Sequence, residues 1–285
     1  MTATANGVSQ QTPFGREERA FDGKRVINYS KDGHVAVIEM NDPPANTYTH
    51  EMMRQLDEAI LDARFDGNVE VILIAGAGEK FFSAGANIGM LNSVTPEFKY
   101  MFCLHANETL SRLEQTPKLV IAALSGHTVG GGLEIAMAAD IRVARKDAGK
   151  IGLPEVALGV LPGTGGTQRL ARLVGKSRAI ELMATGRTYS FEQALDWGII
   201  NDIYEGDAQS FREQVMAYAK QFCSPNKAPM AVGHIKRSVQ TGLELPLQDA
   251  LALERELQSL LFKSEDAKEG IAAYNEKRMA RFKNK

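Results

Sequence analysis

Two glutamates lie beside residues that suit a binding site. Glu134 follows three consecutive glycines, residues 130–132, and Glu155 follows a proline and precedes three apolar residues. Consecutive glycines allow a backbone or ligand to approach where a Cβ would not fit. A helix beginning there would direct free N–H groups at an oxyanion. Such a turn on its own can also be purely structural, but glutamates nearby could move protons beside a polarised carbonyl group.

Two further stretches of small residues belong to the same pattern. Residues 82–87 read FSAGAN, and residues 161–170 read LPGTGGTQRL. Each stretch comes after a predicted strand, and α/β folds bind ligands at the ends of their strands. We therefore expect these two stretches to meet the two glutamates at one site.

The elements that must position these residues alternate between strands and helices. Asp32-Gly33 separates two short apolar runs, Val26–Tyr29 and Val35–Met40, and predicts a β-hairpin. Apolar runs and helical spacing then predict strands at residues 69–75, 119–124 and 140–144, a helix capped by Thr49 and ending near Arg64, and a helix over residues 96–114. From residue 167 helical patterns dominate, at residues 168–174, 177–184, 191–197 and 208–222 and in runs beginning at residues 230, 246 and 265. The sequence predicts an α/β fold that becomes entirely helical near residue 205.

Composition and net charge argue against some classes of protein. The 285 residues are 44% hydrophobic and 24% charged, which is typical of a globular protein, and a net charge of -2 argues against a nucleic-acid binder. No apolar run is long enough to span a bilayer. Residues 1–24 are polar and predict a flexible arm without targeting features, so we expect a cytoplasmic protein. Cys103 and Cys223 predict reduced thiols, and the five histidines show no metal-ligand spacing.

The motifs resemble the crotonase, or enoyl-CoA hydratase/isomerase, superfamily. The segments FSAGAN, GGGLEIAMAAD and LPEVALGVLPGTGGTQRL occur in the order found in that family, and the resemblance covers about residues 25–275. It implies the α/β fold class, as a crotonase-like superhelix of ββα units with a C-terminal helical trimerisation region. The division that we expect is a flexible arm at residues 1–24, an α/β core at 25–205 and a helical region at 206–285.

The resemblance also implies which residues act. The N–H groups of Ala86 and Gly131 would form an oxyanion hole for an acyl-CoA thioester, Glu134 would activate water, and Glu155 would protonate the α-carbon. We expect the helix N-terminus to keep Glu134 anionic and desolvation to raise the pKa of Glu155. The expected substrate contacts are Ala45, Ala84, Asn87, Ile88, Gly130 and Gly163. No cofactor is expected, because CoA is part of the substrate, and relatives form homotrimers or hexamers built as dimers of trimers.

Both glutamates are present, and this favours an enoyl-CoA hydratase that adds water syn across a trans-2-enoyl-CoA. Three alternatives stay open: an enoyl-CoA isomerase, a hydrolase of a cyclic oxoacyl-CoA, and a catalytically silent binding protein, for example one that binds RNA. The sequence departs from the family in several places, two of which lie among the expected substrate contacts. Asn87 replaces the usual aspartate, and Pro44–Tyr48 replaces the common Asn-Ala-Leu turn. Acyl-chain specificity cannot be read from the sequence.

Overall fold

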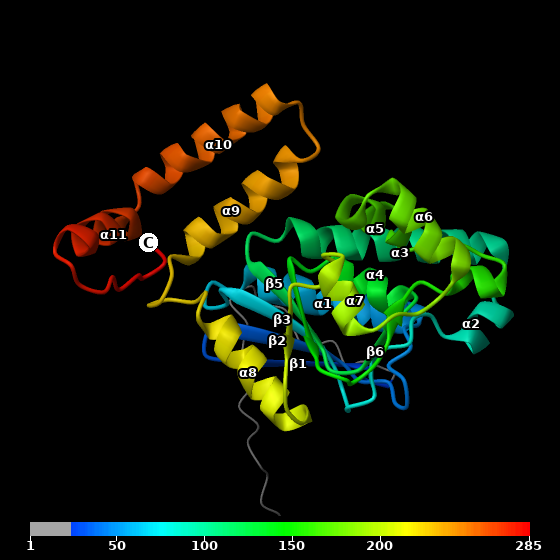
Figure 1. Cartoon of the computed structure of the whole chain (residues 1–285). Helices are drawn as coiled ribbons and strands as arrows, with labels where there is room; N and C mark the ends of the chain where they lie inside the picture. Colours follow the sequence, from blue (N-terminus) through cyan, green and yellow to red (C-terminus); the bar gives the residue numbers. More distant parts are fainter. Residues whose placement is uncertain (1–23) are drawn as a thin grey trace, which may run out of the picture.

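Two β-sheets surrounded by helices form the body of the protein (Figure 1). The structure is a computed structural model that describes residues 24–285, so residues 1–23 of the expected N-terminal arm lie outside the described residues. The larger sheet has the strand order β1-β2-β3-β5-β7-β9 and the smaller one the order β4-β6-β8. The strands of the larger sheet are β1 (Ile27–Asp32), β2 (Val35–Met40), β3 (Val71–Gly76), β5 (Leu119–Leu124), β7 (Ile141–Arg145) and β9 (Asp202–Tyr204).

The larger sheet confirms the predicted hairpin and the predicted buried strands. β1 and β2 pair antiparallel, with Ile27 opposite Met40, and every later strand in this sheet joins in parallel. All six residues of β5 are buried. This burial explains why the sequence of β5 is continuously apolar rather than alternating, since both faces of a parallel sheet are covered.

The smaller sheet was not predicted from the sequence. It consists of β4 (Phe81–Ser83), β6 (His127–Val129) and β8 (Ile151–Gly152), which pair in parallel. Strands of two or three residues are too short to show a hydrophobic period. Helices dominate after residue 167, as predicted, but the sequence analysis did not predict β9, the last strand of the larger sheet.

The predicted helices are confirmed, with small shifts at their ends. The side chains of Thr49 and Thr95 cap α1 and α3 by accepting a backbone N–H from the first turn. The sequence did not predict α2, a single short helix whose cap is Asn87. The helices are α1 (His50–Phe65), α2 (Ile88–Ser93), α3 (Pro96–Gln115), α4 (Gly131–Met137), α5 (Gly166–Val174), α6 (Lys176–Thr185), α7 (Phe191–Asp196), α8 (Ala208–Lys220), α9 (Pro229–Gly242), α10 (Leu247–Phe262) and α11 (Glu265–Asn275).

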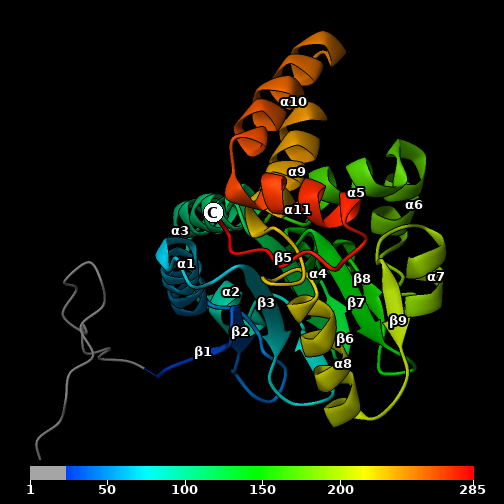
Figure 2. The same cartoon turned by 90° about the vertical axis from the view of Figure 1, so that its left-hand side faces the viewer.

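The C-terminal helices differ in how they attach to the sheets. α8 lies on the larger sheet, where Phe211, Val215 and Ala219 pack against Val71 and Ile121. In contrast, α9 and α10 run antiparallel and extend beyond the sheets in both views (Figures 1 and 2). The division of the chain at residue 206 stays a prediction. Between residues 24 and 285, no helix combines the length and the apolar character needed to cross a membrane.

A buried ion pair attaches α9 to the body of the protein. Lys236 Nζ lies 2.8 Å from Asp140 Oδ2, and the lysine side chain is only 4% exposed. The same ammonium group donates to the Lys118 carbonyl at 3.0 Å, while the Asp140 carboxylate accepts the Val120 N–H at 2.7 Å. Removing one partner of such a pair leaves an uncompensated buried charge.

Replacing Lys236 by methionine is expected to lower the free energy of unfolding by about 3 kcal/mol, because Asp140 loses its cation. The matched control is Lys220→Met, since Lys220 lies the same 2.8 Å from Asp32 but both side chains are about half exposed. That exposed pair is expected to contribute less than about 1 kcal/mol. Urea unfolding at one fixed protein concentration measures both changes, and equal losses in the two variants would contradict the expectation.

Candidate active site

The Ala86 amide is oriented by pairing with Tyr48. The Tyr48 N–H donates to the Gly85 carbonyl at 3.0 Å, and the Asn87 N–H donates to the Tyr48 carbonyl at 3.1 Å. Successive amides of an extended chain point in opposite directions, so these two bonds turn the Ala86 N–H away from Tyr48. Within residues 24–285, this N–H donates no hydrogen bond to another residue.

The glycine turn brings a second amide next to this segment. Gly131 is the first residue of α4, where N–H groups have no partner inside the helix. A Cβ on Gly85 would lie 2.8 Å from the Gly131 nitrogen, so the two backbone segments are in direct contact. Gly130, which precedes the helix, has a φ of 57°, a conformation that glycine adopts without strain. The structure thus brings the predicted amide donors of residues 86 and 131 to neighbouring segments.

Glu134 is buried in the first turn of α4 and is 1% exposed. Its Oε1 accepts the N–H groups of Thr164 and Gly166, each at 2.7 Å. Burial raises the pKa of Glu134 above its usual value, while these hydrogen bonds and the positive charge of Arg169 oppose that rise. The expectation that Glu134 is anionic stays a prediction. The amides that favour its charged form belong to Thr164 and Gly166, in the turn that precedes α5.

Glu155 lies on the other side of the glycine turn, at the start of a single turn of 3-10 helix, η1 (Glu155–Leu158). A Cβ on Gly130 would lie 3.1 Å from Glu155 Oε1. The second carboxyl oxygen is buried and has no hydrogen-bond partner in the described part of the chain. The pKa of Glu155 is raised to about 7, mainly by burial and also by the charge of Glu134, whereas a backbone hydrogen bond and the charge of Lys99 oppose the rise. The direction agrees with the expectation from its apolar sequence neighbours.

Two of the expected substrate contacts lie on the segments that carry the first amide. The Ala84 N–H donates to the Ala45 carbonyl at 2.9 Å, which joins the turn at residues 43–47 to the end of β4. The Ala84 carbonyl lies 3.9 Å from the position of a Cβ on Gly130. Ala45, Ala84 and Gly130 therefore belong to one continuous backbone neighbourhood.

The other expected contacts lie at the two edges of this neighbourhood. Asn87 Oδ1 accepts the Met90 N–H at 2.9 Å and caps α2, so its side chain is engaged in local structure. Ile88 is 52% exposed. Gly163 lies against α3, where a Cβ would be 3.1 Å from Cys103 Sγ.

Residues outside the predicted set also surround the two glutamates. The Tyr48 hydroxyl lies 3.0 Å from Thr164 Oγ1, and the same threonine binds Glu134 through its N–H. Lys99 on α3 acts on Glu155 through its charge. Thr164 lies within the LPGTGG motif, but the motif does not reveal which carboxylate it binds. Tyr48 and Lys99 carry no sequence signal, because their proximity to the site depends on the pairing of Tyr48 with Ala86 and on the packing of α3.

The part of the chain that the structure describes was also searched for side chains that could bind a metal ion. Among residues 24–285, no group of three or more His, Cys, Asp and Glu side chains is arranged to hold a metal ion.

Comparisons with known proteins agree with this arrangement. The family model described as enoyl-CoA hydratase/isomerase matches residues 30–285. A probable enoyl-CoA hydratase of Bacillus subtilis is 38% identical over 259 residues, which cover 90% of this chain and 98% of the relative. A short-chain-enoyl-CoA hydratase of Clostridium acetobutylicum is also 38% identical, over 90% of this chain and 97% of its own.

A solved structure extends the similarity to three dimensions. The crystal structure of an enoyl-CoA hydratase from Geobacillus kaustophilus superposes with a TM-score of 0.88 at 45% sequence identity, and the match covers 92% of this chain and 98% of that one. The sequence motifs and the α/β fold agree with these matches. The chain belongs to the enoyl-CoA hydratase/isomerase family, the crotonase superfamily.

Proposed function

We propose that this protein is an enoyl-CoA hydratase, a lyase that adds water to the double bond of a trans-2-enoyl-CoA. The observation that carries the proposal is a pair of glutamates beside one glycine turn, in different surroundings. Glu134 accepts two backbone N–H groups, whereas Glu155 has a pKa of about 7 and a buried oxygen without a hydrogen-bond partner among residues 24–285. One group is suited to act as a base and the other as an acid.

The amides of Ala86 and Gly131 bind the thioester oxygen in this proposal. Addition of water to the β-carbon moves negative charge onto that oxygen, and two preorganised N–H groups stabilise the charge without reorganising. Ala45, Ala84, Asn87, Ile88, Gly130 and Gly163 are the proposed contacts for the rest of the thioester. CoA enters as part of the substrate, and the proposal includes no further cofactor.

The two carboxyls exchange their protonation states during one turnover. Glu134 removes a proton from water as the oxygen forms a bond to the β-carbon, and Glu155 transfers its proton to the α-carbon. The proposal includes syn addition, in which the hydroxyl group and the proton add to the same face of the double bond. Glu134 ends protonated and Glu155 ionised, so proton exchange with the solvent restores the starting state.

The test is an assay of the purified protein with crotonyl-CoA. Hydration is expected to remove the absorbance of the conjugated enoyl thioester and to add the mass of one water to the product. In heavy water the product is expected to carry one deuterium at the α-carbon. A product of unchanged mass would support an isomerase instead, and free CoA would support a hydrolase. The reported relatives are named as hydratases, and no structural observation favours the isomerase, the hydrolase or a silent RNA-binding protein.

The proposed roles predict a bell-shaped dependence of kcat/KM on pH. Glu155 must be protonated to act as an acid, so the rate is expected to fall as pH rises through its pKa of about 7. Glu134 must be ionised to act as a base, so the rate is expected to fall on the acid side as well. Initial rates between about pH 5 and 9 measure both limbs. A rate that stays level through the alkaline range would contradict the role of Glu155.

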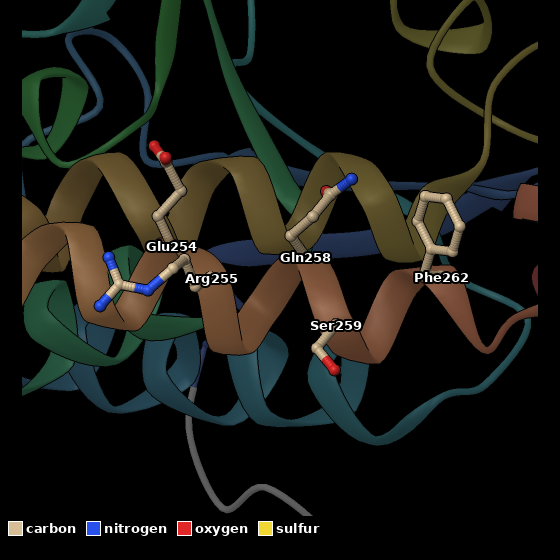
Figure 3. A pocket seen from close by; sticks show the side chains of 5 residues that line it. All are labelled: Glu254, Arg255, Gln258, Ser259 and Phe262. Carbon is tan, nitrogen blue, oxygen red and sulfur yellow. The ribbon is translucent and has the colours of Figure 1, made fainter.

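We also propose that the protein assembles as a homotrimer, alone or paired into a hexamer, through its C-terminal helices. These helices expose large apolar side chains, which are Leu243, Leu247, Leu260, Phe262, Ile271, Tyr274 and Met279, each at least half exposed. Figure 3 shows Glu254, Gln258 and Phe262 along one side of α10, in a hollow that Arg255 and Ser259 complete. Light scattering during size-exclusion chromatography is expected to give three or six times the chain mass, and a monomer would overturn this proposal.

A further inference from the structure

Tyr48 contacts three parts of the proposed catalytic machinery. Its backbone pairs on both sides of Ala86, its ring lies on Gly131, and its hydroxyl reaches the threonine that binds Glu134. We propose that Tyr48 is a positioning residue that holds the two oxyanion amides and the base in one fixed arrangement. This inference rests on the proposed hydration of enoyl-CoA.

The ring leaves no space between Tyr48 and the glycine turn. A Cβ on Gly131 would overlap the tyrosine, with Cε1, the hydroxyl oxygen and Cζ as the nearest atoms. The ring itself is 2% exposed and lies 5.6 Å from the ring of Phe102, measured between centroids. Phe102 is also 2% exposed. Because both rings are enclosed, Tyr48 fixes how far the first residue of α4 can move toward α3.

The hydroxyl extends the contact to the proposed base. It lies 3.0 Å from Thr164 Oγ1, while Thr164 binds Glu134 through its N–H and also through its hydroxyl. A threonine hydroxyl has one proton, so when it donates to the carboxylate it accepts from Tyr48. Burial and the charge of Glu134 both raise the pKa of Tyr48, which keeps the phenol protonated and able to donate.

The competing explanation is that Tyr48 is an ordinary core residue. A core role requires the ring volume but neither the hydroxyl nor the register with Ala86. The hydroxyl separates the two explanations, because only a positioning role requires its contact with Thr164. Tyr189 provides the comparison: it is 5% exposed, and its hydroxyl has no hydrogen-bond partner among the described residues. The two tyrosines therefore form a matched pair for substitution.

The decisive variant is Tyr48→Phe, which keeps the ring and removes the hydroxyl. Thr164 then loses a donor, so the ionised form of Glu134 is less well stabilised. We expect kcat to fall about fivefold with an unchanged KM, and the acid limb of the pH profile to move to higher pH. The other charged groups that act on Glu134 are Arg169 on α5 and Glu155 on η1, and this substitution changes neither. Tyr189→Phe is expected to keep both the wild-type kcat and the wild-type acid limb.

The second variant, Tyr48→Leu, also removes the ring and lets Gly131 shift, so we expect kcat to fall about 100-fold. A readout that needs no turnover is the infrared stretching frequency of the thioester carbonyl in bound butyryl-CoA labelled with carbon-13. Binding to the wild-type protein and to Tyr48→Phe is expected to lower this frequency equally, whereas Tyr48→Leu is expected to lose most of the shift.

These outcomes separate failure of the inference from failure of the proposed function. If the wild-type protein hydrates crotonyl-CoA but Tyr48→Phe keeps the wild-type kcat and acid limb, the inference is overturned and the function stands. If the wild-type protein does not hydrate the substrate, the function fails, and an equal infrared shift in Tyr48→Leu would then overturn the inference. Should Tyr48→Leu not fold, the comparison of Tyr48→Phe with Tyr189→Phe still decides whether Tyr48 is a positioning residue.

Discussion

Replacement of either Glu134 or Glu155 by glutamine is expected to lower kcat for hydration about 100- to 10,000-fold. Glutamine has nearly the volume of glutamate but neither accepts nor donates a proton in this reaction. Glu134→Gln removes the proposed base, and it also places an amide against the N–H groups of Thr164 and Gly166. Glu155→Gln removes the proton source and is expected to remove the alkaline limb near pH 7 as well.

The double variant tests whether the glutamates act as a unit. When two groups act on the same transition state, removing the second lowers the rate little once the first is gone. The double variant is therefore expected to be far less impaired than the product of the single effects. Glu108→Gln is the control, because Glu108 lies exposed on α3. Stopped-flow absorbance with crotonyl-CoA measures all four proteins. Turnover within about tenfold of wild type in either single variant would contradict the assigned roles.

Replacement of Gly131 by alanine is expected to lower kcat/KM about 100- to 1000-fold, the usual loss for one oxyanion donor. The new Cβ would overlap the Tyr48 ring, so either the ring or the first residue of α4 must move. Movement of the first residue of α4 displaces the Gly131 N–H from its position relative to Ala86.

Gly67→Ala is the matched control for this substitution, since no heavy atom lies within 4 Å of a Cβ at that position. It is expected to keep the wild-type kcat/KM. Thermal unfolding of both variants distinguishes a displaced amide from a protein that has not folded. A folded Gly131→Ala variant with wild-type activity would show that this amide does not bind the thioester oxygen.

Local sequence patterns were sufficient to predict the helices and strands that are long and regular. β5 was predicted because all of its residues are apolar, and α1 because a threonine cap precedes residues at helical spacing. The strands of the smaller sheet lack such patterns, since β8 contains only two residues. Their pairing depends on segments that are distant in the sequence, such as Phe81 opposite His127.

The candidate site, too, could be predicted from the sequence only in part. The sequence by itself determined the family, the glycine turn and the two glutamates, because those motifs are contiguous and their residue types are distinctive. Only the tertiary structure decided that Glu134 is held by amides about 30 residues away and that burial raises its pKa. It also decided that the Tyr48 ring lies on Gly131. Burial and close approach depend on which segments pack together, and that information is not contained in the local residue pattern.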